Sequence, residues 1–160
     1  MTVRRNVVIN GSLSLGNAIG GDMNVAGNWT NAGTFIHNTR LVTFNGSSAQ
    51  TLTGNTTFDY LTLNNSTGLT LQAASAVTVN QTLALTSGKL TLGANNLTIG
   101  STGSITASAT NYIVTNGTGA LVRNAVGNSA TAFPIGNSAS FYTPLTITNT
   151  GTVNNMAVSS

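Results

Sequence analysis

The sequence predicts an all-β protein: a right-handed parallel β-solenoid with about 22 residues per coil, followed by a short partial β-sandwich. Two observations carry this prediction. Short apolar–polar–apolar units recur along the chain, and three successive units make up about 22 residues, as from Leu61 to Leu83. No stretch of ten residues shows a helical spacing of apolar residues. A repeat with three short strands and three tight corners is typical of coils that stack on one another.

Each alternating unit places two apolar residues on one face of a strand and the residue between them on the other. Before residue 61 the inward positions are Val7, Ile9, Leu13, Leu15, Met23, Val25, Phe35, Val42, Phe44, Leu52 and Phe58. The most regular units are Leu61–Leu63, Leu69–Leu71, Val77–Val79, Leu83–Leu85, Leu90–Leu92 and Leu97–Ile99. The pattern then continues through Ile105, Ile113 and Leu121. Because Asn and Gly between the units favour tight turns, we expect the corners there.

The alternative architecture is an antiparallel sandwich, which also uses short strands separated by turns. The regular units follow one another at short steps, since they start at positions 61, 69, 77, 83, 90 and 97. That spacing leaves strands of three to five residues and corners of two to four, which is short for hairpin partners. It therefore favours the solenoid.

The texture of the sequence changes near residue 125. Both prolines, Pro134 and Pro144, follow this point, and the apolar–polar alternation at 144–149 is longer than the earlier units. Proline cannot donate to a strand ladder and is typical of edges and strand starts. We therefore expect solenoid repeats over residues 1–125, and a partial β-sandwich or connecting strands over residues 126–160.

The composition excludes several classes of function. Asn, Thr, Ser and Gly make up 83 of the 160 residues, there is no Cys or Glu, and the only acidic residues are Asp22 and Asp59. Sites built on paired carboxylates or on several His or Cys ligands lack the residues they need. Among five cations only Arg4 and Arg5 are adjacent, so no basic stripe for nucleic acid is present. We expect no catalytic residue, no cofactor, no metal ion and no membrane span.

Two residues that could take part in catalysis, His37 and Asp59, lie one predicted coil apart. They are therefore expected to stack on adjacent coils within salt-bridge distance. A catalytic dyad would also need a Ser nucleophile nearby. The favoured interpretation is a surface ion pair worth less than about 1 kcal/mol.

The outward residues of the strands predict ladders on the surface. Thr70 should lie beside Thr91, and Thr78 beside Thr98, and such hydroxyl arrays could bind ice or a polysaccharide. Most units show a single outward Thr, so the favoured interpretation is that Thr is simply a good strand residue. Trp29, with Phe35 and Phe44, could form a platform for a sugar, but is interpreted mainly as core.

Asn residues recur at the predicted corners. Stacked in register, they would form amide ladders of the kind found in repetitive β structures. The residues concerned are Asn64, Asn65, Asn80, Asn95 and Asn96.

Several segments resemble a known family. These are "GDMNVAGNWTNAGTF", "LVTFNGSSAQTLTG", "TTFDYLTLNNSTGLTL", "LTSGKLTLGANNLTIG" and "FPIGNSASFYTPLTITNTGT". They are similar to repeats in the large secreted, adhesin-like surface proteins of bacteria that use type IX secretion. The resemblance implies an extracellular β-solenoid followed by a small β-sandwich, as one segment of a longer chain.

These observations together predict a non-catalytic structural module, located extracellularly or at the cell surface. It would act as a stiff spacer, an adhesin stalk or a self-assembling fibre subunit. The alternative is a binding module that holds ice or a surface polysaccharide through outward Thr and Asn ladders. Because the alternation begins at Val3 and the last strands lie near residue 158, both ends are expected to expose strand edges. We therefore expect either end-to-end self-association, with residues 140–160 of one copy completing the next, or continuation in a longer chain.

Overall fold

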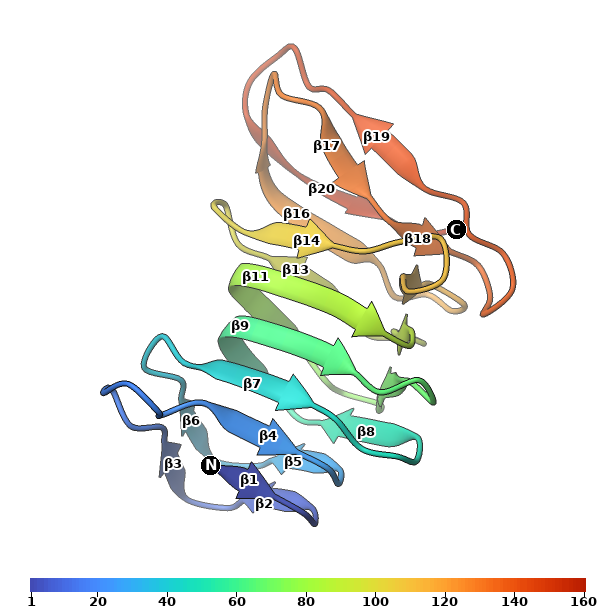
Figure 1. The fold of residues 1–160 in the computed structure, drawn as a ribbon. Coiled ribbons are helices and arrows are strands. Elements are labelled where there is room, and N and C mark those ends of the chain that lie inside the picture. Colours follow the sequence, from blue (N-terminus) through green and yellow to red (C-terminus); the bar gives the residue numbers. More distant parts are fainter.

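The computed structural model describes all residues from 1 to 160 and contains twenty β-strands and no helix. Figure 1 shows them stacked as rungs from the N-terminal end to the C-terminal end. Their bounds are β1 (Thr2–Val3), β2 (Val7–Ile9), β3 (Ser12–Ser14), β4 (Met23–Val25), β5 (Trp29–Asn31), β6 (Thr34–Ile36), β7 (Leu41–Phe44), β8 (Gln50–Thr53), β9 (Thr56–Asn64), β10 (Leu69–Leu71), β11 (Val77–Ser87), β12 (Leu90–Thr91), β13 (Leu97–Ile99), β14 (Ser104–Thr106), β15 (Ile113–Val114), β16 (Leu121–Val126), β17 (Thr131–Phe133), β18 (Ile135–Gly136), β19 (Leu145–Ile147) and β20 (Asn154–Val158).

The strands form a parallel β-solenoid of about six turns, with stacked coils about 22 residues apart, which confirms the predicted fold class. Val7 pairs with Trp29 at one end of the stack, and Ile113 pairs with Ile135 at the other. One sheet runs β18-β15-β12-β10-β8-β5-β2, and a nine-stranded sheet includes β1, β4, β7, β9, β11, β13, β14, β16 and β20. Every ladder within the stack of coils is parallel, so the antiparallel sandwich alternative is wrong for this part of the chain.

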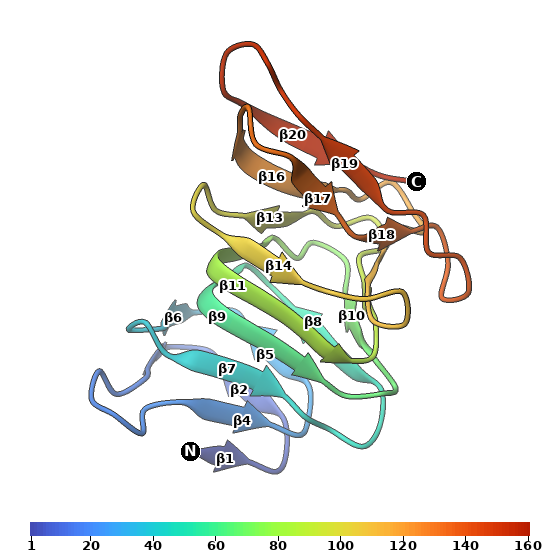
Figure 2. The same ribbon diagram turned by 45° about the horizontal axis from the view of Figure 1, so that its top comes forward.

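Three strands are longer than the sequence predicts, β16 by one residue and β9 and β11 by several. β9 has nine residues and β11 has eleven, so the expectation of three to five residues per strand is wrong here. The units at Val77 and Leu83 belong to one strand, whose register shifts between Val79 and Thr82. Such a bulge bends a strand sharply, so the chain turns a corner without leaving the ladder. Figure 2 shows β9 and β11 continuing around this corner.

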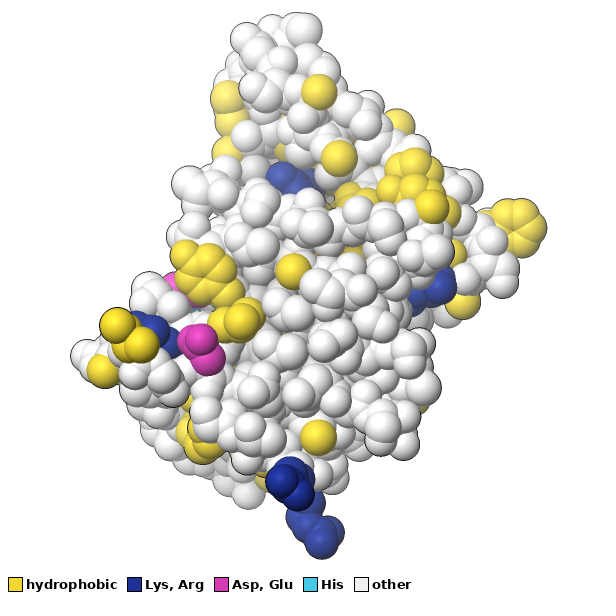
Figure 3. All heavy atoms as spheres, in the orientation of Figure 1, with side chains coloured by type: hydrophobic (Ala, Val, Ile, Leu, Met, Phe, Trp, Pro, Cys, Tyr) yellow, Lys and Arg dark blue, Asp and Glu magenta, His cyan; other side chains and the backbone are white.

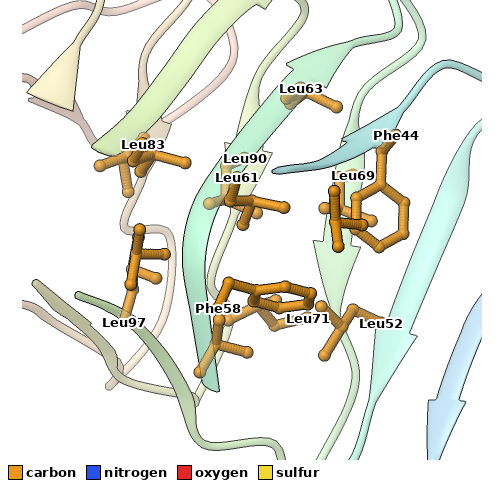
Figure 4. Packing of buried hydrophobic residues seen from close by; sticks show 14 of the residues in the cluster. Phe44, Leu52, Phe58, Leu61, Leu63, Leu69, Leu71, Leu83, Leu90 and Leu97 are labelled. Carbon is orange, nitrogen blue, oxygen red and sulfur yellow. The ribbon is translucent and has the colours of Figure 1, made fainter. Parts of the chain in front are cut away.

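The interior is one continuous hydrophobic core. It is a cluster of 27 buried residues that runs from Val7 in the first complete coil to Ile135 in the last. Figure 4 shows Leu52, Leu61, Leu83 and other side chains from different strands pointing toward one another. The inward positions expected from the alternation are confirmed, with Leu13, Phe35 and Ile105 only half-buried. No coil could bury this apolar surface alone, so the coils stabilise one another.

Close stacking at the corners explains why glycine is needed there. Gly54 lies over the carbonyl of Asn31, and Gly88 lies over the carbonyl of Asn65, one coil below in each case. A Cβ at either glycine would overlap that carbonyl oxygen. Both glycines also have a positive φ, near +90°, which L side chains rarely adopt. The repeated Asn–Gly pairing is therefore a packing requirement of stacked corners.

The last coil and the segment after it differ from the rest. The expected boundary between residues 125 and 126 falls inside β16, and β18 still extends the parallel seven-stranded sheet. The chain then reverses: β19 pairs antiparallel with β17, and β20 pairs antiparallel with β16. Figure 1 shows this return lying across the C-terminal end. The change from parallel to antiparallel pairing occurs in the part of the chain that contains both prolines and the longer alternation.

Candidate functional sites on the faces and ends of the solenoid

The structure brings His37 and Asp59 together, as their spacing predicts. His37 Nδ1 lies 3.1 Å from Asp59 Oδ2, and the amide of Asn80, one coil further, donates to Asp59 Oδ1 at 3.0 Å. The Thr39 N–H also approaches His37 Nδ1, at 3.3 Å. One nitrogen cannot accept from Thr39 and donate to the carboxylate together, and the shorter contact to the charged group identifies Nδ1 as the donor.

This pair ties three successive coils together at one corner. Asp59 is largely buried and accepts hydrogen bonds from both neighbours, whereas a quarter of the His37 side chain is exposed. No Ser or Thr hydroxyl is hydrogen-bonded to the His37 ring, so no nucleophile stands where a triad would need it. The arrangement acts as a structural ion pair between coils.

The predicted Thr ladders are confirmed. Thr70 pairs with Thr91, and Thr57, Thr78 and Thr98 form a column across β9, β11 and β13. Because β9 and β11 are long, a second column lies beside the first. It contains Thr82 and Ser104, whose hydroxyls lie 3.3 Å apart. Figure 3 shows that most of the face turned toward the viewer in Figure 1 carries neither charge nor large apolar groups. The outward faces of these strands therefore carry rows of hydroxyl groups.

Trp29 does not form a sugar platform. Its side chain is fully buried, and Nε1 donates to the Thr56 hydroxyl at 3.2 Å. Its ring packs against three phenylalanines, with centroid distances of 5.0 Å to Phe35, 6.2 Å to Phe44 and 5.6 Å to Phe58. These aromatics fill the wide N-terminal part of the core.

The corner Asn residues do not hydrogen-bond to one another. Asn95 is buried, and its amide donates to the carbonyls of Leu71 and Leu92 while its oxygen accepts from the Ser75 N–H. Asn65 likewise donates to the Ser48 carbonyl. The expected amide ladders are therefore wrong for these residues. Asn96 accepts from the Ala120 N–H, whereas Asn80 donates to the Asp59 carboxylate and Asn65 also donates to the side-chain oxygen of Gln50. Asn65 and Asn95 thus satisfy backbone groups of the corners that stack beside them.

The N-terminal end of the solenoid is open. β1, β2 and β3 each have a strand neighbour on one side only. An apolar cavity of about 390 Å³ lies among them, and its hydrophobic lining consists of Met1, Val3, Val7, Val8, Ile9, Leu13 and Met23. Val8 is 60% exposed. This end therefore presents both unpaired backbone groups and apolar side chains.

The C-terminal end is covered by the antiparallel return. Ile147, Met156 and Val158 pack against the core from β19 and β20. The Ser160 N–H donates to the Thr115 hydroxyl at 3.1 Å, which holds the last residue against the stack. Arg123 donates to the Gly103 carbonyl at 3.1 Å, and burial lowers the pKa of its guanidinium. Phe133, at this end, is fully buried.

No three side chains of His, Cys, Asp or Glu converge in the chain. The chain has no helix that could cross a membrane. No protein-family model, no curated protein and no solved structure matches the sequence or the fold.

Proposed function

We propose that the chain is a non-catalytic structural module of an extracellular or cell-surface protein, a stiff spacer that stacks end to end with further coils. The observation that carries the proposal is the single core of 27 buried residues that joins the first coil to the last. Of the 80 backbone hydrogen bonds, 51 lie within the strand ladders. In parallel sheets of a solenoid these bonds run along the stacking axis, so stretching or bending the module would strain many of them together. The extracellular location rests on the resemblance of the sequence.

The open N-terminal end supports the stacking part of this proposal. Unpaired strand edges are templates for another strand, and the groove between them is lined by apolar side chains. The antiparallel return at the other end exposes Leu145 by 43% and Val153 by 57%, and β20 has one free edge. We expect β19 and β20 of one copy to cover the first coil of the next.

Sedimentation velocity and electron microscopy of the purified chain at micromolar concentration test this assembly. We expect oligomers or short filaments, and we expect Val8→Lys to reduce them to monomers because it places a charge at the groove. Thr78→Lys, on the side of the solenoid, is the matched control and should assemble like the unaltered chain. Monomers of the unaltered chain, or equal disruption by both variants, would rule out end-to-end stacking through this groove.

The hydroxyl columns favour a second candidate function, binding of ice or a surface polysaccharide. Thr57, Thr78 and Thr98 repeat at the strand spacing of about 4.8 Å. Thermal hysteresis and binding to insoluble polysaccharides would be measured for the unaltered chain and for Thr78→Lys. Activity that this variant abolishes would support the second function, and no activity in either assay would exclude it.

A further inference from the structure

A second cavity, distinct from the N-terminal groove, lies on the outer face of the seven-stranded sheet. Its volume is about 200 Å³. Thr70 on β10 and Thr91 on β12 lie in its floor, Ser66 lies at the adjoining corner, and Lys89 precedes β12 at its edge. Ala139, from the loop between β18 and β19, also lines it. We propose that this pocket binds a sugar ring that carries a carboxylate, with Lys89 recognising the charge.

The floor of the pocket offers hydroxyl groups that the fold leaves free. Thr70 and Thr91 are paired in register on neighbouring strands, so their side chains project side by side. Both residues are half-buried, and neither hydroxyl makes a hydrogen bond within the chain. A hydroxyl both donates and accepts, which suits a ligand that carries several hydroxyl groups of its own.

Lys89 is the only lysine in the chain, and it has no anionic partner. Its Nζ lies 5.1 Å from the centre of the Tyr112 ring, an aromatic face that attracts a cation. Of the two carboxylates, Asp59 is paired with His37, and Asp22 accepts from the Leu41 N–H. The ammonium therefore keeps its capacity to bind an anion from outside.

Tyr112 also fixes the loop that lines the pocket from above. Its side chain is buried, and its hydroxyl donates to the Ser138 carbonyl at 2.8 Å. Its ring lies 5.0 Å from that of Tyr142, and the Thr143 N–H donates to the Ile135 carbonyl at 2.9 Å. One residue thus positions both the ammonium and the loop, so the pocket exists before any ligand arrives.

The same loop presents an aromatic side chain to solvent. Phe141, just after Ala139 in the chain, is 66% exposed although the loop around it is held by hydrogen bonds. Phe141 does not line the pocket itself, so its ring offers an apolar face only to a sugar that extends beyond the pocket.

The chemistry of the pocket distinguishes a charged sugar from a small inorganic anion. Phosphate is usually held by several cations or by a set of converging N–H groups. Here a single ammonium stands beside uncharged hydroxyls, which matches one negative charge on a ligand rich in hydroxyl groups. The volume is below that of a site for a drug-sized ligand and suits a single ring.

The test uses the whole chain with trigalacturonate as the probe. Titration followed by amide chemical shifts should move the signals of Gly68, Thr70, Lys89 and Thr91, and calorimetry should give a saturable affinity. We expect Lys89→Gln to weaken the affinity at least tenfold and Thr70→Ala/Thr91→Ala to weaken it several-fold. The matched control Thr43→Ala/Thr62→Ala removes an in-register pair of half-buried hydroxyls from the other sheet, outside the Thr57, Thr78 and Thr98 column, and should leave it unchanged. Circular dichroism confirms that each variant is folded.

Three results would overturn the proposal. They are an absence of binding at millimolar trigalacturonate, equal binding of its neutral methyl ester, and equal loss in the control variant. Inorganic phosphate is titrated in parallel, and the same shifts at the same affinity would show a small-anion site instead. The proposal is independent of end-to-end stacking, because Val8→Lys, which we expect to prevent that stacking, alters no residue of the pocket and can be titrated in the same way.

Discussion

At the C-terminal end of the solenoid the chain turns back and covers its last coil, whereas at the N-terminal end the first coil faces outward. Both ends contain the same kind of parallel rung, with apolar residues inward and strand edges to satisfy. At one end β19 and β20 supply antiparallel partners, and Phe133 on β17 is fully buried. At the other, Val8 is exposed and an apolar cavity of about 390 Å³ is open.

The difference shows that the repeated coil by itself supplies neither strand partners nor apolar cover for the coils at the ends of the stack. Each coil is stabilised by its neighbours, so a terminal coil lacks half of its contacts unless other residues replace them. The antiparallel return provides that replacement locally. At the open end, we propose that another set of coils covers the first coil.

The largest expected effect comes from truncating a core side chain at each of the two ends and comparing the losses of stability. Phe133→Ala at the covered end should lower the free energy of unfolding by about 3–5 kcal/mol, because it leaves a large cavity in a fully packed site. Leu13→Ala at the open end should cost about 1–2 kcal/mol, since Leu13 already borders a cavity. Urea unfolding followed by circular dichroism measures both. Equal losses would mean that the two ends are equally well packed in solution.

The next effect contrasts two glycines one coil apart. Gly33 lies over the carbonyl of Gly11, so Gly33→Ala should destabilise the protein by about 2–3 kcal/mol through overlap with that backbone. Gly11→Ala meets no atom within 4 Å and should change stability by less than about 0.5 kcal/mol. The shift in urea midpoint distinguishes them. A large loss for Gly11→Ala would show that another coil occupies the space at the open end, as in an assembled form.

The corner Asn residues provide a third contrast. Asn95→Ala should cost about 2 kcal/mol, because it leaves the Ser75 N–H and the Leu71 carbonyl without their partner in a buried site. Asn6→Ala removes one exposed hydrogen bond to the Asn28 N–H and should cost less than about 1 kcal/mol. Amide hydrogen exchange at the neighbouring coils, together with urea unfolding, measures the two losses. Similar exchange rates in both variants would contradict the proposed role of the buried amide.

The smallest expected effect concerns the ion pair in the N-terminal half. A double-mutant cycle of His37→Ala and Asp59→Asn should give a coupling free energy below about 1 kcal/mol, because His37 is partly exposed. The coupling should weaken as salt is added. Thermal unfolding of the four proteins at two salt concentrations measures it. A coupling of several kcal/mol would indicate that the pair anchors the N-terminal coils.

Several contacts of the candidate sites could be predicted, because they follow from the number of residues in one coil. The pairing of Thr70 with Thr91 and the contact between His37 and Asp59 are both consequences of the length of one coil. The pocket at Lys89 could not be predicted this way. It requires Tyr112 from the next coil and Ala139 from a loop that returns over the sheet, and no periodic pattern indicates where such a loop lies.

The sequence by itself determined the strands, the inward positions and the corners of this protein. Alternation is a local property, and so is the positive φ at a corner residue such as Gly54, which favours glycine. Only the tertiary structure decided that β9 and β11 continue around a corner, that β20 returns antiparallel onto β16, and that one end is covered while the other is open. These features depend on which strands become neighbours in the folded chain. The hydrogen-bonding capacity of a strand edge is the same for parallel and antiparallel partners, so the local sequence does not select between them.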